Sequence, residues 1–169
     1  MNQLRYKKIL YYFILLTALF LILVLPSIIT VQTPQQQQAT QHQNNIQAQK
    51  ATATSIFNNN LLVAAISLIP FVGWSYLIYV LWNTGVVIAS YGHPWYWIFN
   101  NVFAWIELAV YSYAVLQSWK LYHLIPQWRC NDFKVTFTKT VAYTMITVIL
   151  ALLASAVLEY MVIIRVVQI

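Results

Sequence analysis

Few residues of this sequence carry side chains that could do chemistry, and one of them lies within an apolar run. The 169 residues include three Asp and Glu, three His and one Cys. Glu107 falls near the middle of a predominantly apolar run from Ile98 to Ser118. An ionised carboxylate at that depth in a membrane is costly, so such residues normally face the bundle interior and mark functional sites. Glu107 is therefore the first candidate functional residue.

The polar groups expected around Glu107 are Asn83 and Thr84, from the preceding apolar region, and Tyr111, one helical turn further on. Three roles are compatible with such a cluster. In the first, Glu107 ties the exposed backbone of an interrupted helix to its neighbour. In the second, it takes part in a proton- or cation-coupled step of transport. In the third, it contacts a helix of a partner protein.

Three consecutive asparagines precede the second apolar region of the chain. An Asn side chain accepts hydrogen bonds from the free N–H groups at a helix start. Asn59 or Asn60 is therefore predicted to be the N-cap of the following helix. The remaining asparagines are free to face a partner.

The other reactive side chains do not form a recognisable catalytic or metal site. His42, His93 and His123 are far apart and are expected on different sides of the membrane, and Cys130 has only Asp132 nearby. The sequence contains neither a Gly-rich phosphate loop nor a zinc-binding His-Glu-x-x-His motif. We therefore expect no catalytic residues, no cofactor and no metal, and a protein that is not an enzyme.

The composition indicates a membrane protein. Hydrophobic residues make up 61% of the chain and charged residues 7%, with a net charge of +6. A soluble domain carries about 25% charged residues, so this chain has too few to cover a soluble surface. The nine cations lie near the ends of apolar runs, which indicates topology and contact with anionic lipid head groups rather than nucleic-acid binding.

The apolar runs and the segments between them predict an organised set of elements. A run of about 20 residues suffices to cross the hydrocarbon core as a helix. Glu159, near the end of the last run, is predicted to lie at the interface. The predicted segments are a basic N-terminus (1–8), an uncleaved anchor (9–31), an external Gln-rich loop (32–56) and a helical membrane domain (57–169) that contains a broken region (61–91), a helix (98–118), a basic loop (119–139) and a last helix (140–164).

The region 61–91 is too long for one upright span and too short for two full ones. Pro70, Gly73 and Gly85 are its predicted helix breaks, since Pro removes a backbone donor and Gly permits tight turns. The region is either one kinked, tilted helix or a hairpin of two short helices.

Counting the cations on each side of the membrane favours the hairpin. With a hairpin, seven cations lie in the cytoplasm and two outside, whereas a single crossing leaves four inside and five outside. Positive residues concentrate in cytoplasmic segments. We therefore expect an all-α integral membrane protein with three full transmembrane helices plus a broken, re-entrant hairpin, about five helical segments in all. Its N-terminus is expected in the cytoplasm and its C-terminus outside the plasma membrane.

Three short stretches, Ile56–Asn60, Ile69–Gly73 and Trp82–Gly85, resemble the stage II sporulation protein M family. Glu107 also matches the acid of a Pro-His-Gly-x-x-Glu signature in that family. The first three positions of the signature hold Val102, Phe103 and Ala104 instead. The resemblance covers roughly residues 56–121.

The resemblance implies a multi-pass scaffold that organises other membrane or envelope proteins, and it brings no catalytic residues. The alternative is a small transporter or channel subunit in which Glu107 and the broken hairpin line a polar path. Such a subunit would need to form a homo-oligomer, because the chain is small and has no repeated half.

Overall fold

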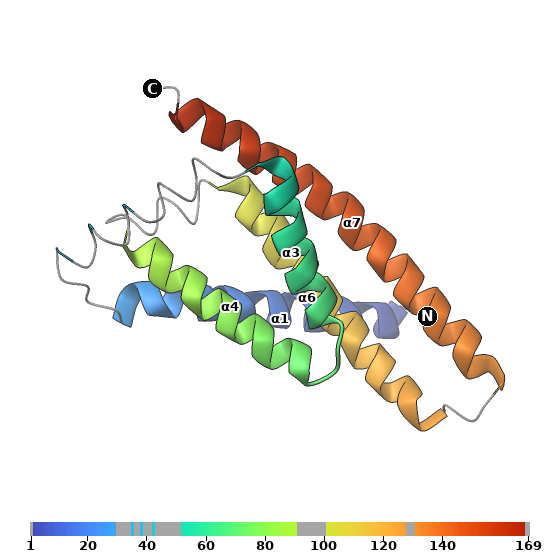
Figure 1. The fold of residues 1–169 in the computed structure, drawn as a ribbon. Helices are drawn as coiled ribbons and strands as arrows, with labels where there is room; N and C mark the ends of the chain where they lie inside the picture. The colour runs from blue at the N-terminus through green and yellow to red at the C-terminus, as the bar shows by residue number, and fades with distance from the viewer. Residues whose placement is uncertain are drawn as a thin grey trace.

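The computed structural model describes residues 2–29, 52–90, 101–127 and 131–167, together with the isolated residues 35, 38 and 42. All regular secondary structure in these residues is helical (Figure 1). The predicted all-α fold class is therefore confirmed. The helices are α1 (Asn2–Ile29), α3 (Ala53–Ser67), α4 (Val72–Ala89), α6 (Val102–Leu124) and α7 (Asn131–Val167), with a short 3-10 helix at Ile125–Gln127.

Three of the described helices are long and apolar enough to cross a membrane. These stretches are Ile9–Pro26 in α1, Val72–Ala89 in α4 and Asp132–Met161 in α7. Three full spans were predicted and three are found, but they are not the same three segments. The sequence predicted a full span in 98–118 rather than in the second half of the hairpin. The corresponding helix α6 is long enough, but its polar residues make it less apolar than α4.

Helices α3 and α4 form an antiparallel hairpin, as the charge count favoured over a single kinked helix (Figure 1). Pro70 lies in the turn between them, as predicted. Phe71 has φ 65° and ψ −56°, and the N–H of Val72 donates to the carbonyl of Pro70 at 2.8 Å. This is a γ-turn, a tight and strained conformation that reverses the chain.

The predictions that Gly73 and Gly85 break the helix are wrong, because both lie inside the continuous helix α4. Each glycine instead allows another helix to approach closely. A Cβ atom on Gly73 would lie 2.3 Å from the carbonyl oxygen of Ile66 in α3. A Cβ atom on Gly85 would lie 2.1 Å from the carbonyl oxygen of Leu23 in α1. Contacts this short exclude any side chain at either position unless the backbone shifts.

The start of α3 corrects two predictions. The N-cap is Thr52, not Asn59 or Asn60. Its side chain accepts from the N–H of Ser55 at 3.1 Å, and the Ser55 hydroxyl accepts from the N–H of Thr52 at 2.9 Å. This reciprocal capping box satisfies two free donors, so the helix begins before the asparagines. The predicted Gln-rich loop 32–56 therefore ends earlier, and residues 30–51 lie largely outside the described residues.

The basic segment 119–139 is also more helical than predicted. Helix α6 continues to Leu124 and α7 begins at Asn131, so Lys120, Lys134 and Lys139 lie on helices rather than in a loop. The helices are longer than the apolar runs. Helical hydrogen bonds join backbone groups within one segment, so they can continue past the membrane boundary whether the side chains are apolar or charged.

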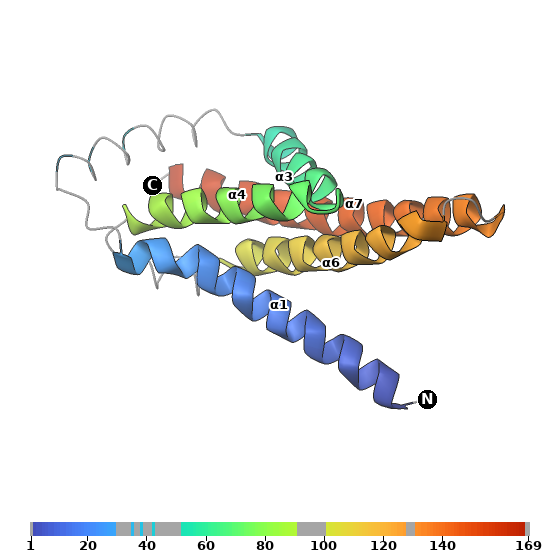
Figure 2. The same ribbon diagram turned by 90° about the horizontal axis from the view of Figure 1, so that it is seen from below.

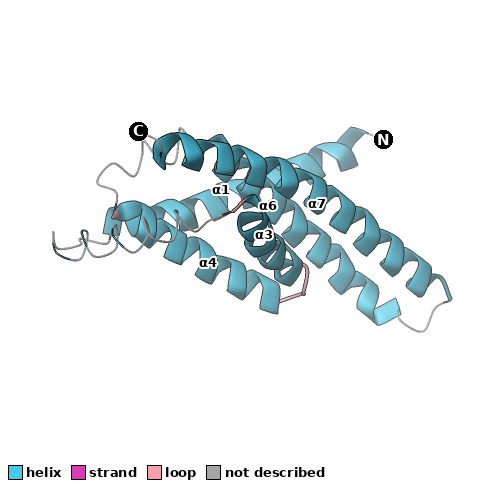
Figure 3. Cartoon of the chain, turned by 45° about the horizontal axis from the view of Figure 1, so that its top comes forward, coloured by secondary structure: helices cyan, strands magenta, loops and turns pink. Residues whose placement is uncertain are grey.

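The helices pack around an aliphatic core. Helix α7 packs against α3 and α6, and α1 packs against α4 and α6 (Figure 3). The N-terminal part of α1 diverges from the other helices (Figure 2). The most deeply buried core residues include Leu77, Val148 and Leu152, with Leu23, Val63 and Leu108 nearby in the same cluster.

Candidate functional site

The carboxyl group of Glu107 joins three helices. Glu107 lies in the second turn of α6, closer to the helix start than its mid-run position predicted. Its Oε1 atom accepts a hydrogen bond from Nδ2 of Asn60 in α3. The same oxygen lies 3.2 Å from Oγ of Ser155 in α7. The site therefore depends on the packing of α3, α6 and α7 against one another.

Ser155 has two acceptors within reach. Its Oγ atom lies 3.2 Å from Oε1 of Glu107 and also 3.2 Å from the carbonyl oxygen of Phe103. One hydroxyl proton can be donated to only one of them at a time. Ser155 is fully buried, so leaving it without an acceptor is unfavourable. This serine holds the first turn of α6 against α7.

A cavity of about 120 Å³ opens beside Glu107. It lies between α3, α4 and α6, with Leu23 of α1 at one side. Asn60 and Tyr111 are buried, whereas Asn59 and Thr84 are exposed and mark the rim. The polar residues that line it are Glu107, Asn59, Asn60, Thr84 and Tyr111.

Most of the residues singled out in the sequence therefore meet in one place, but Asn83 does not. Its side chain is exposed and donates to the carbonyl oxygen of Tyr79 at 2.9 Å within α4. Thr84 lines the cavity while donating to the carbonyl oxygen of Val80 at 2.9 Å. Neither residue hydrogen-bonds to Glu107. Each side chain instead donates to the backbone carbonyl one helical turn earlier in α4. The partnership of Glu107 with Asn83 and Thr84 was thus predicted wrongly.

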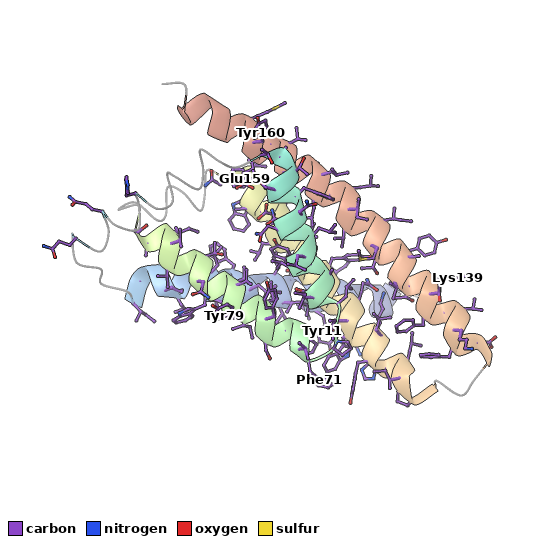
Figure 4. All side chains as sticks on the ribbon, in the orientation of Figure 1. Tyr11, Phe71, Tyr79, Lys139, Glu159 and Tyr160 are labelled. Carbon is purple, nitrogen blue, oxygen red and sulfur yellow. The ribbon has the colours of Figure 1, made fainter. Side chains whose placement is uncertain are left out.

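Two residues of the site were missed from the sequence, both on α7. Besides Ser155, Glu159 is partly buried and lies close enough to Glu107 to interact with it electrostatically. Figure 4 shows Glu159 in the C-terminal half of α7, close to the start of α3. Ser155 and Glu159 are four residues apart and therefore share one face of a helix. This polar pair in an apolar run was the feature of the sequence that could have indicated both residues as part of the site.

A second cluster lies at the other end of the hairpin and is aromatic. The rings of Trp74 and Trp119 stack with centroids 5.3 Å apart, and those of Phe71 and Tyr122 meet edge-on at 5.0 Å. Trp119 and Tyr122 lie in the last turns of α6. These contacts attach the γ-turn to the end of α6.

Of the three histidines, His42 and His123 belong to the part of the chain that the structure describes. His123 contacts the rings of Trp119 and Tyr122, and His42 is an isolated exposed residue. His93 and Cys130 lie outside the described residues. Across the described helices, no group of three His, Cys, Asp or Glu residues could hold a metal ion.

These features define an all-helical protein of the multi-pass membrane class, with a polar cluster that joins its helices. Searches against family models, curated proteins and solved structures found nothing that matches the chain. Its function must therefore be argued from its own residues.

Proposed function

We propose that the protein is a non-enzymatic membrane scaffold that organises other membrane or envelope proteins. The observation that carries the proposal is the way Glu107 is held. Its carboxyl group is bound by Asn60 of α3 and Ser155 of α7, so a carboxyl group of α6 joins three helices. A rigid bundle that presents fixed helix faces suits a scaffold. The resemblance of residues 56–121 to the stage II sporulation protein M family implies the same role.

We further propose that the N-terminus is cytoplasmic and the C-terminus lies outside the plasma membrane. The N-terminus, the end of α6 and the start of α7 lie toward the same end of the bundle, and the C-terminus lies toward the other (Figures 1 and 2). Lys7, Lys120 and Lys134 belong to these ends, and Figure 4 shows Lys139 in the same half of α7. The positive-inside tendency assigns this end to the cytoplasm, where anionic lipid head groups are available.

The proposed orientation predicts that Cys130, the only thiol, is protected in intact cells. We expect a membrane-impermeant maleimide to leave the protein unlabelled in intact expressing cells and to label it after the membrane is permeabilised. Labelling is measured by the mass shift of the purified protein. Labelling of intact cells would place Cys130 outside and reverse the proposed topology.

A second candidate function is a small transporter or channel subunit, which the polar cavity beside Glu107 favours. Buried carboxylates next to polar cavities occur on ion pathways in membrane proteins. The chain is small, so this function needs a homo-oligomer.

The variant Glu107→Gln separates the two functions, because it keeps a hydrogen-bond acceptor and removes ionisation. A scaffold is expected to co-purify in mild detergent with the same envelope proteins, in amounts within about twofold of the wild type. The unstable variant Glu107→Ala is expected to lose them and serves as the matched control.

A wild-type ion flux in reconstituted vesicles that Glu107→Gln abolishes would favour the transporter instead. Failure of wild-type protein to recover any envelope protein above a detergent-only background would contradict the scaffold.

A further inference from the structure

The cavity beside Glu107 leaves one carboxylate oxygen available. Both contacts of the carboxyl group, from Asn60 and from Ser155, are made to Oε1. Within the described part of the chain, Oε2 makes no hydrogen bond, and Glu107 lines the cavity. The carboxyl group is thus held in place through one oxygen while the second is free to bind a ligand.

The cavity has a largely aliphatic wall, and the polar side chains set into it carry oxygen and amide groups. Asn59 and Asn60 each carry an amide oxygen, and Tyr111 carries a phenol oxygen. Thr84 donates its proton to Val80, so its lone pairs remain to accept a positive group. Carboxylate, amide and hydroxyl oxygens are the ligands that hard cations prefer.

No protein cation neutralises Glu107 among the described side chains. The charged group that acts on it is another acid, Glu159, whereas Lys120 lies near the end of α6 and Lys134 and Lys139 lie near the start of α7, away from Glu107. An ionised carboxylate without a partner in a low-dielectric interior is strongly unfavourable, and the carboxyl group avoids that cost either by taking up a proton or by binding a cation in its place. A bound cation would supply the missing positive charge.

We propose that the cavity binds a small monovalent cation, an alkali ion or ammonium, between Glu107, Asn59, Asn60, Thr84 and Tyr111. The charge argues for a monovalent ion, because Glu107 is the only acid that lines the cavity. A divalent ion would keep a net positive charge in this environment. The volume of about 120 Å³ exceeds the roughly 30 Å³ share of one water, so the ion can retain part of its hydration shell.

The exposed rim at Asn59 and Thr84 provides the route into the cavity. The bound ion would bridge α3, α4 and α6 and so stabilise the hairpin against the rest of the bundle. The proposal does not depend on the scaffold role, since a structural ion and a transported ion would use the same oxygens.

The test is the thermal unfolding of the purified full-length protein in mild detergent, followed by circular dichroism. Sodium, potassium and ammonium chloride are each compared with N-methyl-D-glucamine chloride at equal ionic strength, because that organic cation is too large for the cavity. At a hundredfold excess over Kd, a bound cation is expected to raise Tm by about 5–10 °C, with saturation. Equal Tm values in all four salts would overturn the proposal.

Two variants locate the effect. Glu107→Gln is expected to abolish the cation-dependent rise in Tm, whereas Glu159→Gln, which removes the neighbouring acid outside the cavity, retains it. A cation-dependent rise in Tm that persists in Glu107→Gln would show that the cation does not bind at Glu107 and would overturn the proposal.

If Glu107→Gln does not fold, Thr84→Val is compared with the wild type instead, and its cation affinity is expected to be about tenfold lower. A negative result in these experiments leaves the co-purification result intact, so the failure of this site and of the scaffold proposal are distinguishable.

Discussion

Replacing Glu107 by alanine is expected to lower the free energy of unfolding by about 3 kcal/mol. The change leaves the buried amide of Asn60 without its acceptor, which costs about 1–3 kcal/mol, and leaves the hydroxyl of Ser155 only the carbonyl oxygen of Phe103. It also enlarges the cavity that already lies beside the carboxyl group. The measurement is an unfolding titration with SDS of the protein in mild detergent, followed by circular dichroism.

The matched control is Glu107→Gln, whose amide oxygen can still accept from both partners. With alkali and ammonium ions kept well below the Kd of the proposed site, we expect this variant to lie within about 1 kcal/mol of the wild type. Ser155→Ala removes one contact and is expected to cost about 0.6–1 kcal/mol, in line with hydrogen bonds between membrane helices. Equal losses for Glu107→Ala and Glu107→Gln would show that charge rather than hydrogen bonding stabilises the bundle.

Replacing Gly85 by alanine is expected to destabilise the protein by about 2 kcal/mol, although helix propensity alone predicts the opposite sign. Alanine is favoured over glycine by about 1 kcal/mol in a helix interior. The new Cβ atom, however, would lie 2.1 Å from the carbonyl oxygen of Leu23 and 3.0 Å from Cγ of Pro26. Since the first contact is with backbone, α1 and α4 must move apart and lose packing, which costs about 1–3 kcal/mol or more.

Asn83→Ala is the control for Gly85→Ala, because it lies on the same helix but is exposed. It loses only a hydrogen bond within α4, so we expect a change within about 0.5 kcal/mol. The same SDS titration measures both variants. A stabilised Gly85→Ala protein would show that α1 and α4 do not pack at this glycine.

Much of the architecture is predictable from single stretches of sequence. The apolar runs predict helices because the membrane interior leaves the backbone no other way to satisfy its donors and acceptors. Pro70 predicts the turn between α3 and α4, since proline cannot continue the hydrogen-bonded ladder. The predicted start of α3 was wrong because the side chains of Thr52 and Ser55 cap each other, so the helix begins before it reaches the asparagines.

The candidate site was only partly predictable. Glu107 and Tyr111 are four residues apart on one helix, so they share a face whatever the tertiary structure. Asn60 and Ser155 come from helices that are 47 and 48 residues away in the sequence. Local periodicity says nothing about which of the remaining helices supplies a partner for the carboxyl group.

The sequence by itself determined the all-helical class, the turn at Pro70 and the hairpin, because these follow from hydrophobicity, local backbone chemistry and the distribution of cations. Only the tertiary structure decided which groups hold Glu107 and why Gly85 is glycine. Both depend on the crossing angle and relative sliding of pairs of helices. Those quantities result from the interlocking of whole helix surfaces, so no single stretch of sequence contains them.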